Sequence, residues 1–309
     1  MVKSRAKTSG TTSRARPAPR RPARRQTLGA PGLRWLLAAG IVAALLAVAG
    51  VVWAVGRDGK QPAAVSIEHV HGLGVNPVNG ALYAATHNGL YQLPTGTAAS
   101  RVGVGEQDTM GFAIVGPDRF LGSGHPAPGQ DGPPQLGLIE STDGGATWTN
   151  RSLAGQADFH ALRYRHGTVY GHNSATGQLI VSRDQTTWDT RSTIALRDFV
   201  VSPDSPGTLL ATTQQGVQRS ADGGRTWAPT AGPPLVLLDW QSDDGLWGVT
   251  ATGEVLRSAD GGAAWRATGR IDGTVTAFAA TGVDLYAAVH ERGIFHSGDG
   301  GTTWTQRYP

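Results

Sequence analysis

Three histidines of this 309-residue chain could together bind a metal ion. His69 and His71 are two residues apart, so on a β-strand both side chains would point to the same face. His160 is expected at the equivalent position of a later strand, with Met110 on a strand between them. Imidazole nitrogens suit zinc, nickel and copper, and a thioether adds a soft ligand that favours copper. The pattern therefore indicates a candidate site for a divalent metal or copper.

Two aspartates offer a different chemistry. Glycoside hydrolysis generally needs two carboxyl groups at a controlled separation, one as acid and the other as nucleophile or base. Asp108 and Asp158 are the best available catalytic pair, with Asp198 and Asp239 in reserve. The distance between the two carboxylates depends on the fold, so the sequence leaves catalysis open.

These residues belong to a larger polar set that the repeats described below place on one edge of the fold. The candidate ligand-binding residues are His69, His71, His87, His125, His160, Arg197 and His290. In the alternative interpretation, each of them hydrogen-bonds only to water or to a neighbouring strand. Their concentration on one edge favours a ligand site.

A recurring octapeptide must set where these residues lie. Four full copies and one shortened copy are present, namely Ser141-Thr-Asp-Gly-Gly-Ala-Thr-Trp148, Ser220-Ala-Asp-Gly-Gly-Arg-Thr-Trp227, Ser258-Ala-Asp-Gly-Gly-Ala-Ala-Trp265, Ser297-Gly-Asp-Gly-Gly-Thr-Thr-Trp304 and Ser182-Arg-Asp-Gln-Thr-Thr-Trp188. Their aspartates are Asp143, Asp184, Asp222, Asp260 and Asp299, at intervals of 41, 38, 38 and 39 residues. That period is typical of one four-stranded propeller blade.

The residue types of the octapeptide suit a tight hairpin. The two glycines accept positive φ, and the aspartate can hydrogen-bond to backbone N–H groups of its own turn. The tryptophan is a large anchor on the outgoing strand. We therefore interpret the five aspartates as structural residues that fasten hairpins, not as catalytic acids.

Six repeats of apolar strand, turn and second strand begin near residues 68, 108, 158, 197, 236 and 273, which predicts six blades. Strands of a blade alternate in direction, so inner strands start and second strands end at one edge. The histidines are expected at this edge and the octapeptide hairpins at the other. A Pro-rich insertion at residues 126–135 is predicted to rise over the histidine edge.

The octapeptide resembles the Asp-box, or BNR repeat, of sialidases, other glycoside hydrolases, sortilin-like receptors and photosystem assembly factors. The resemblance covers residues 65–309 and implies an all-β, six-bladed β-propeller with Asp-box hairpins. The segments His69-Val-His-Gly-Leu-Gly74 and Ala85-Thr-His-Asn-Gly-Leu90 are similar to exported bacterial proteins described as glycosyl-hydrolase-like. Sialidase activity is not expected, because the arginine triad has one plausible member, Arg197, and the family's Phe-Arg-Ile-Pro segment is missing.

Charge separates the N-terminus from the rest of the chain. Residues 1–34 hold ten of the 27 basic side chains and none of the 23 acidic ones. The other residues therefore have 17 basic and 23 acidic side chains and a formal charge of −6. We interpret residues 1–34 as a disordered basic tail, and no nucleic-acid partner is expected for the folded domain.

Residues 35–56 have no charged side chain and are long enough, as a helix, to cross a membrane. We interpret them as an uncleaved signal anchor followed by a linker, residues 57–64, although a cleavable signal peptide is the alternative. The basic tail would stay cytoplasmic, so the chain is expected in the cell membrane with the propeller outside. The absence of cysteine means that no disulfide holds the domain.

Three functions remain open from the sequence. The first is a glycosyl-hydrolase-like domain that binds or hydrolyses a glycan-type ligand at the channel mouth. The second is a histidine-rich metal-binding propeller, and the third is a non-catalytic module for an envelope polysaccharide or protein. The fold does not choose among these three functions.

Overall fold

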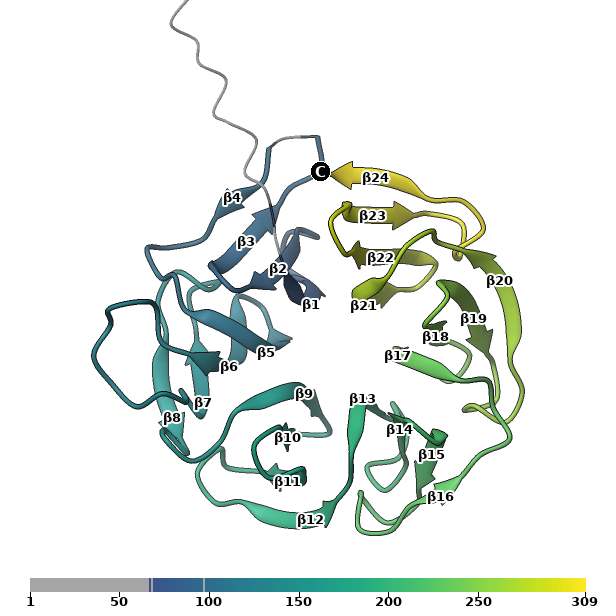
Figure 1. Cartoon of the computed structure of the whole chain (residues 1–309), viewed down its shortest axis with the longest axis horizontal. Coiled ribbons are helices and arrows are strands. Elements are labelled where there is room, and N and C mark those ends of the chain that lie inside the picture. The colour runs from purple at the N-terminus through teal and green to yellow at the C-terminus, as the bar shows by residue number, and fades with distance from the viewer. Residues whose placement is uncertain (1–66, 68, 97) are drawn as a thin grey trace, which may run out of the picture. The chain divides into compact units, whose positions relative to one another are not determined.

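A computed structural model describes residues 67, 69–96 and 98–309. These residues form 24 β-strands in six four-stranded antiparallel sheets, arranged as blades around a central axis (Figure 1). Within each blade the strands run in sequence order from the centre outwards. The prediction of an all-β, six-bladed propeller is confirmed.

The first three blades contain the residues of greatest interest. Their strands are β1 (Val70–Val75), β2 (Leu82–Thr86), β3 (Gly89–Leu93) and β4 (Ser100–Arg101); β5 (Asp108–Gly116), β6 (Arg119–His125), β7 (Leu138–Ser141) and β8 (Thr149–Ser152); and β9 (Phe159–Arg165), β10 (Thr168–Asn173), β11 (Gln178–Ser182) and β12 (Asp189–Thr193).

The last three blades complete the ring. Their strands are β13 (Leu196–Val201), β14 (Leu209–Thr213), β15 (Gly216–Ser220) and β16 (Ala228–Pro229); β17 (Leu235–Trp240), β18 (Leu246–Thr250), β19 (Glu254–Ser258) and β20 (Arg266–Arg270); and β21 (Val275–Thr281), β22 (Asp284–Val289), β23 (Gly293–Ser297) and β24 (Thr305–Tyr308).

Apolar packing between the blades holds the ring together. Six buried clusters are found in the described part of the chain, one at each seam between neighbouring blades. The seam between the last blade and the first joins Tyr308 and Ile294 to Leu82 and Leu93, which closes the ring. The Tyr308 hydroxyl also donates a hydrogen bond to the Pro94 carbonyl.

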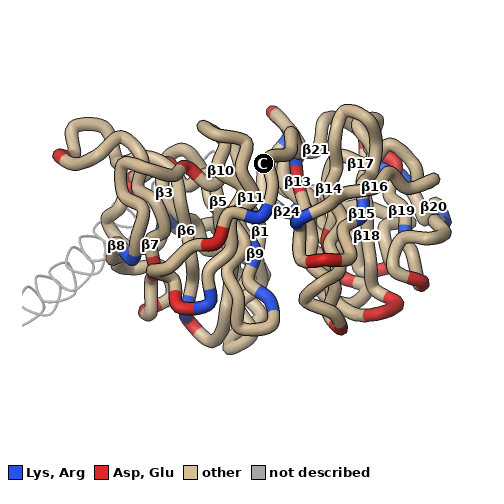
Figure 2. Tube along the Cα trace, turned by 90° about the horizontal axis from the view of Figure 1, so that it is seen from below, with Lys and Arg blue, Asp and Glu red and all other residues tan. Residues whose placement is uncertain are grey.

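Register separates two edges of the ring. In blade two, Asp108 at the start of β5 pairs with His125 at the end of β6, whereas Ser141 before the hairpin pairs with Phe120 at the start of β6. We call the histidine edge the upper rim and the hairpin edge the lower rim. Seen from the side in Figure 2, acidic residues recur along the edge drawn lowest.

In every octapeptide hairpin on the lower rim, the serine hydroxyl donates to the aspartate, and the aspartate accepts a backbone N–H of its own turn. In the second copy, the Ser220 hydroxyl donates to Asp222 Oδ1 at 2.8 Å and accepts the Gly224 N–H at 2.9 Å. The Thr226 N–H and hydroxyl donate to the two oxygens of Asp222 at 2.9 and 2.6 Å. These bonds lower the pKa of Asp222 below its usual range. In the shortened copy, Gln185 takes the positive φ that glycine has elsewhere, 66°.

The predicted tail, membrane anchor and linker, residues 1–34, 35–56 and 57–64, lie outside the described residues. In the part of the chain that is described, no helix is both long enough and apolar enough to span a membrane.

Candidate metal centre

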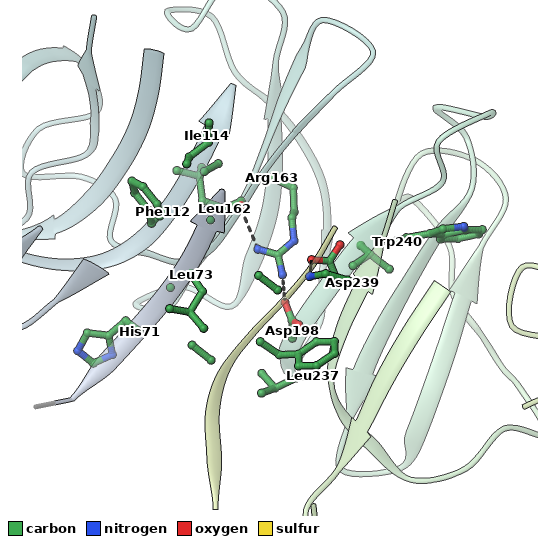
Figure 3. Close-up of a pocket in the computed structure, with 18 of the residues that line it drawn as sticks. His71, Leu73, Phe112, Ile114, Leu162, Arg163, Asp198, Leu237, Asp239 and Trp240 are labelled. Carbon is green, nitrogen blue, oxygen red and sulfur yellow. Dashed lines mark hydrogen bonds and ion pairs between the residues drawn. The ribbon is translucent and has the colours of Figure 1, made fainter. Parts of the chain in front are cut away.

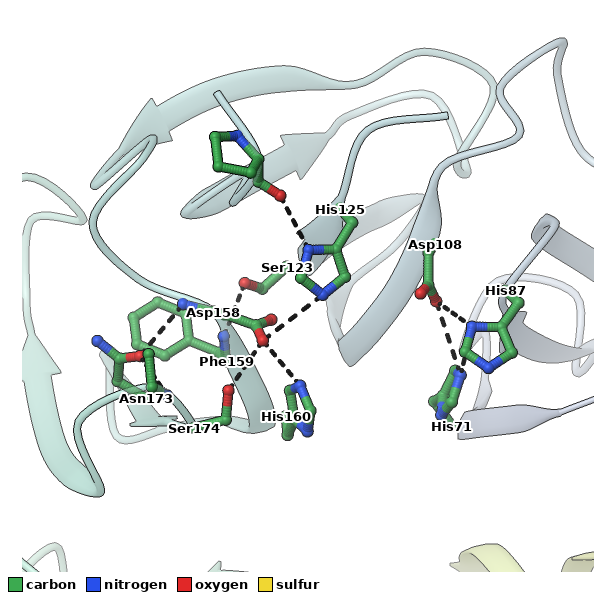
Figure 4. Close-up of polar contacts among 12 residues, drawn as sticks. His71, His87, Asp108, Ser123, His125, Asp158, Phe159, His160, Asn173 and Ser174 are labelled. Atoms are coloured by element: carbon green, nitrogen blue, oxygen red, sulfur yellow. Dashed lines mark hydrogen bonds and ion pairs between the residues drawn. The ribbon is translucent and has the colours of Figure 1, made fainter. Parts of the chain in front are cut away.

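The upper rim brings residues from neighbouring blades together. His71 is the second residue of β1, His87 directly follows β2, and Asp108 begins β5 of the next blade. In the same way, His125 ends β6, while Asp158 and His160 flank the first residue of β9. Two groups result, and each consists of two histidines and one aspartate from both sides of a seam (Figure 4).

The first group, which we call the blade 1–2 cluster, consists of His71, His87 and Asp108. His87 Nδ1 lies 2.8 Å from Asp108 Oδ1, and His71 Nε2 lies 3.6 Å from the same oxygen. The two imidazole nitrogens are 3.3 Å apart. Ligands about 2.0–2.2 Å from a tetrahedral metal are separated from one another by about 3.3–3.6 Å. Two of the three distances fall in this range, and the third, at 2.8 Å, is shorter.

The carboxylate of the blade 1–2 cluster has an unsatisfied oxygen. Asp108 Oδ1 is buried, and despite its closeness to His87 Nδ1 no group in the described structure donates a well-oriented hydrogen bond to it. Burial, followed by the nearby His87, lowers the pKa of His71 to about 4, so this imidazole is neutral at neutral pH. A neutral imidazole beside an unpaired carboxylate oxygen is suited to bind a cation.

The second group, the blade 2–3 cluster, consists of His125, Asp158 and His160. Asp158 Oδ2 lies 2.8 Å from His160 Nε2 and 3.6 Å from His125 Nε2. The Ser174 hydroxyl donates to the same oxygen at 2.8 Å. This carboxylate is more buried than that of Asp108, with 9% of its side chain exposed against 21%.

Hydrogen bonds give the blade 2–3 cluster a different charge state. Burial alone would raise the pKa of Asp158, but the hydrogen bonds from His160 and Ser174 outweigh burial and lower it. The hydrogen bond to Asp158 raises the pKa of His160. The contact between Asp158 and His160 therefore favours the ionised carboxylate and the protonated imidazole.

Two further predicted histidines adjoin the blade 1–2 cluster. The ring of His69 is centred 5.1 Å from that of His87 and 5.9 Å from that of His290. His69 lies just before β1 in left-handed backbone, with φ of 50°, so the strand alternation used in the prediction does not apply to it. His290 is 3.7 Å from Glu291.

A cavity of about 540 Å³ lies in the central channel and is lined by residues of the inner strands (Figure 3). Of the residues predicted to line the channel mouth, five line this cavity, namely His69, His71, Met110, His160 and Arg197, whereas Asp108 and Asp158 do not. The ring of polar side chains is therefore continuous with the channel.

The two reserve aspartates lie deeper in the cavity and tie blades together. Asp198 accepts hydrogen bonds from Arg163 and from the Leu238 N–H of the next blade, the latter at 2.9 Å. Asp239 accepts the Ala280 N–H of the following blade at 2.9 Å. Burial raises the pKa of Asp239. Each of these carboxylates thus has a structural role at a seam.

The structure groups the candidate ligands differently from the predicted set of His69, His71 and His160. His71 belongs to the blade 1–2 cluster, His160 belongs to the blade 2–3 cluster, and His69 belongs to neither. The physical reason is that β5 of blade two lies between β1 and β9, so each histidine meets the aspartate of its own seam. Met110, the proposed soft ligand, lines the same cavity as His71 and His160.

The proposed catalytic pair is also divided. Asp108 and Asp158 each contact two histidines of their own cluster. The hydrogen bonds of Asp158 favour its ionised form, which suits a ligand or a base better than an acid. The sequence did not predict the Ser174 hydroxyl, which donates to Asp158, or the Pro134 carbonyl, which lies 2.8 Å from His125 Nδ1. Neither residue type indicates a metal site.

Comparisons with known proteins find similarity in structure and none in sequence. The sequence matches no protein-family model and no curated protein. A GH74 xyloglucanase from Xanthomonas campestris has a similar structure, with a TM-score of 0.52 and 18% identity over 78% of this chain and 46% of the enzyme. A GH74 enzyme from Niastella koreensis matches with a TM-score of 0.50, 16% identity and 76% of this chain covered.

Propellers that are not named as enzymes match as well. YCF48 bound to D1 peptide has a TM-score of 0.50 at 16% identity, covering 78% of this chain and 83% of that one. The chain spans less than half the length of the two GH74 enzymes, 46% and 36%. At these identities the similarity shows the β-propeller fold alone.

Proposed function

We propose that the chain is a divalent transition-metal-binding propeller whose metal site is the blade 1–2 cluster. The observation that carries the proposal is the triangle formed by His71 Nε2, His87 Nδ1 and Asp108 Oδ1, with sides of 2.8, 3.3 and 3.6 Å. The buried and unsatisfied Asp108 oxygen supports it, because a bound cation would satisfy that oxygen.

The ligand types select the class of metal. Two imidazoles and one carboxylate favour zinc, copper(II), nickel or iron(II) over calcium and magnesium, which prefer oxygen ligands. Three protein ligands leave a coordination position for water or substrate, as in catalytic sites and unlike structural sites. A metal bound in this way supplies Lewis-acid chemistry, and the cavity that His71 lines offers room for a ligand.

A glycan-type ligand in the same cavity is a second candidate. The cavity is lined by the carboxyl groups of Asp198 and Asp239 and by Arg163, polar groups of the kind that hydrogen-bond to sugar hydroxyls. The fold shared with GH74 enzymes is in keeping with this role. A non-catalytic envelope polysaccharide or protein partner is the third candidate, in keeping with the fold shared with YCF48 bound to D1 peptide.

The side of the membrane on which the metal site lies depends on the proposed N-terminal anchor. Residues 35–56 are proposed as a membrane anchor, with the basic tail in the cytoplasm and the propeller outside. The octapeptide hairpins are proposed as Asp-boxes of the BNR type, since all five aspartates accept hydrogen bonds within their own turns. The metal site would then take its ion from the extracytoplasmic space.

Metal binding by the full-length chain in mild detergent tests the proposal. Isothermal titration with Zn²⁺ should show high-affinity binding that a His71→Ala/His87→Ala variant loses at the blade 1–2 cluster. The matched control is His296→Ala, because His296 contacts Asp284 at 2.8 Å without a third ligand. Equal binding by the wild type and the double variant would contradict the proposal.

A further inference from the structure

The blade 2–3 cluster has features that an ion pair alone does not need. The His296–Asp284 pair contains two groups, whereas the blade 2–3 cluster adds a third, His125, whose Nε2 lies 3.6 Å from Asp158 Oδ2. The ligand atoms of His125, Asp158 and His160 all lie within 4.8 Å of one another. The third group points to coordination of a cation.

A backbone carbonyl holds His125 in the orientation of a metal ligand. His125 Nδ1 lies 2.8 Å from the Pro134 carbonyl oxygen, which accepts a hydrogen bond only from a protonated Nδ1. In the neutral ring, the lone pair is then on Nε2, the atom that faces Asp158. Metal-bound histidines are commonly oriented by a hydrogen bond from their second nitrogen to a carbonyl or carboxylate.

The Pro-rich insertion supplies that carbonyl from a pinned position. The Leu136 N–H donates to the Gly124 carbonyl at 2.8 Å, and the Gly155 N–H donates to the Gln135 carbonyl at 2.8 Å. Asn150 also donates to the Leu136 carbonyl. The end of the insertion is therefore fixed against β6 and β8, and it holds Pro134 over His125.

The carboxylate of the cluster has one supported oxygen and one unsatisfied oxygen. The Ser174 hydroxyl fixes Asp158 Oδ2, while Asp158 Oδ1 is buried and has no hydrogen-bond donor in the described structure. Without a cation this oxygen is desolvated at a cost. Because both histidines face Oδ2, a metal at this site would satisfy Oδ1 by binding both oxygens of the carboxylate.

From these observations we infer that the blade 2–3 cluster is a second binding site for a divalent transition metal, with His125, Asp158 and His160 as its ligands. It uses none of the ligands of the blade 1–2 cluster, so the two sites fill separately. To bind His160 Nε2 and Asp158 Oδ2, the metal must replace the 2.8 Å contact between these two atoms. The blade 1–2 cluster offers an aspartate oxygen with no hydrogen bond to lose, so the second site binds more weakly.

Metal stoichiometry tests the inference. Zn²⁺ is titrated into the full-length wild type and into His87→Ala, His125→Ala and His296→Ala variants, and bound zinc is measured after removal of free ion. Two ions are expected for the wild type and for His296→Ala, and one for each of the other two variants. Thermal melting of each variant checks that it is folded, and His125→Gln replaces His125→Ala if the latter does not fold.

The outcomes separate this inference from the proposed function. One ion in the wild type that survives in His125→Ala overturns the second site and leaves the proposed function standing. One ion that is lost in His125→Ala and retained in His87→Ala overturns the proposed function and supports the second site. No bound ion overturns both. Ser174→Ala serves as a test of positioning and should weaken the second site by about 10–100-fold without removing it.

Discussion

The two rims of the propeller use aspartate in opposite ways. On the lower rim, each carboxylate bonds to groups within its own octapeptide, as Asp299 does with the Thr303 N–H at 2.9 Å. On the upper rim, Asp108 meets two histidines of the preceding blade, and Asp158 meets His125 of the preceding blade as well as the nearby His160. Lower-rim aspartates serve the fold, because their partners are local, and upper-rim aspartates are free to serve a ligand.

The carboxylates of the two rims differ in how many hydrogen-bond donors the protein supplies to them. Both oxygens of Asp299 accept donors, from Ser297, Thr303 and the Thr303 backbone. Asp158 has one oxygen supported and one without a donor, and Asp108 Oδ1 has no donor although it is buried. The fewer donors a carboxylate has from the protein, the more a bound cation gains.

The largest expected effect is the loss of metal binding on substitution of Asp108. Asp108→Asn keeps the shape of the side chain but removes the anionic ligand, so Zn²⁺ affinity at the blade 1–2 cluster should fall on the order of 100-fold or more. Isothermal titration measures it. The matched variant is Asp222→Asn on the lower rim, which should leave both metal affinities unchanged. Equal effects of the two substitutions would remove the distinction between the rims.

The next effect concerns stability on the lower rim. Ser220 is buried, and its hydroxyl accepts the buried Gly224 N–H. Ser220→Ala should lower the free energy of unfolding by about 1–3 kcal/mol, because that N–H loses its acceptor. Urea unfolding measures the change, and Zn²⁺ binding should be unaffected. Ser242→Ala, at an exposed serine that donates to Asp244, is the control and should change stability by less than about 0.5 kcal/mol.

The same contrast explains what the sequence could predict. The hairpins and the six blades follow from local chemistry, since all partners of Asp222 lie within seven consecutive residues. The histidine groups depend on contacts across seams. Asp108 and His87 are 21 positions apart in the sequence, and Asp158 and His125 are 33 apart. The alternating direction of the strands predicted the upper rim but not which residues meet there.

His69 illustrates the limit most clearly. Alternation along a regular strand placed it beside His71, but the strand begins at Val70 and the register is irregular between Val70 and Gly72. Bulges and left-handed residues depend on packing against the next blade, which no short sequence pattern records. Conversely, His87 and His125 lie at the ends of second strands, as the sequence predicts. That they contact Asp108 and Asp158 is seen only in the three-dimensional structure.

Acid should destabilise the lower rim. Hydrogen bonds lower the pKa of all five hairpin aspartates, that of Asp299 to about 2. A carboxyl group with a lower pKa in the folded state than in the unfolded state stabilises the fold above its unfolded pKa, about 3.8–3.9. That stabilisation is lost as the pH falls through the folded pKa. The urea midpoint should therefore decrease between about pH 4 and pH 2.

Two variants assign this acid sensitivity to the hairpins. Asp299→Asn should make the urea midpoint depend less on pH in that window, because one linked proton is removed. Asp131→Asn should not, because Asp131 lies exposed on the Pro-rich insertion and accepts no hydrogen bond in the described structure. A midpoint that stays constant from pH 4 to pH 2 in the wild type would contradict the structural role of the lower-rim carboxylates.

The smallest expected effect concerns the one full hairpin copy that has no threonine hydroxyl beside its aspartate. Thr147, Thr226 and Thr303 donate from their hydroxyls to their aspartates at 2.6, 2.6 and 2.7 Å, but the third full copy has Ala264, which offers only its N–H. Ala264→Thr should supply the missing donor to Asp260 and raise the melting temperature by at most about 2–4 °C. Ala264→Val has the same shape without a hydroxyl, so the difference between the two variants isolates the hydrogen bond. Equal melting temperatures would mean that backbone donors already satisfy the lower-rim carboxylate, and the contrast with Asp108 would then rest on N–H groups alone.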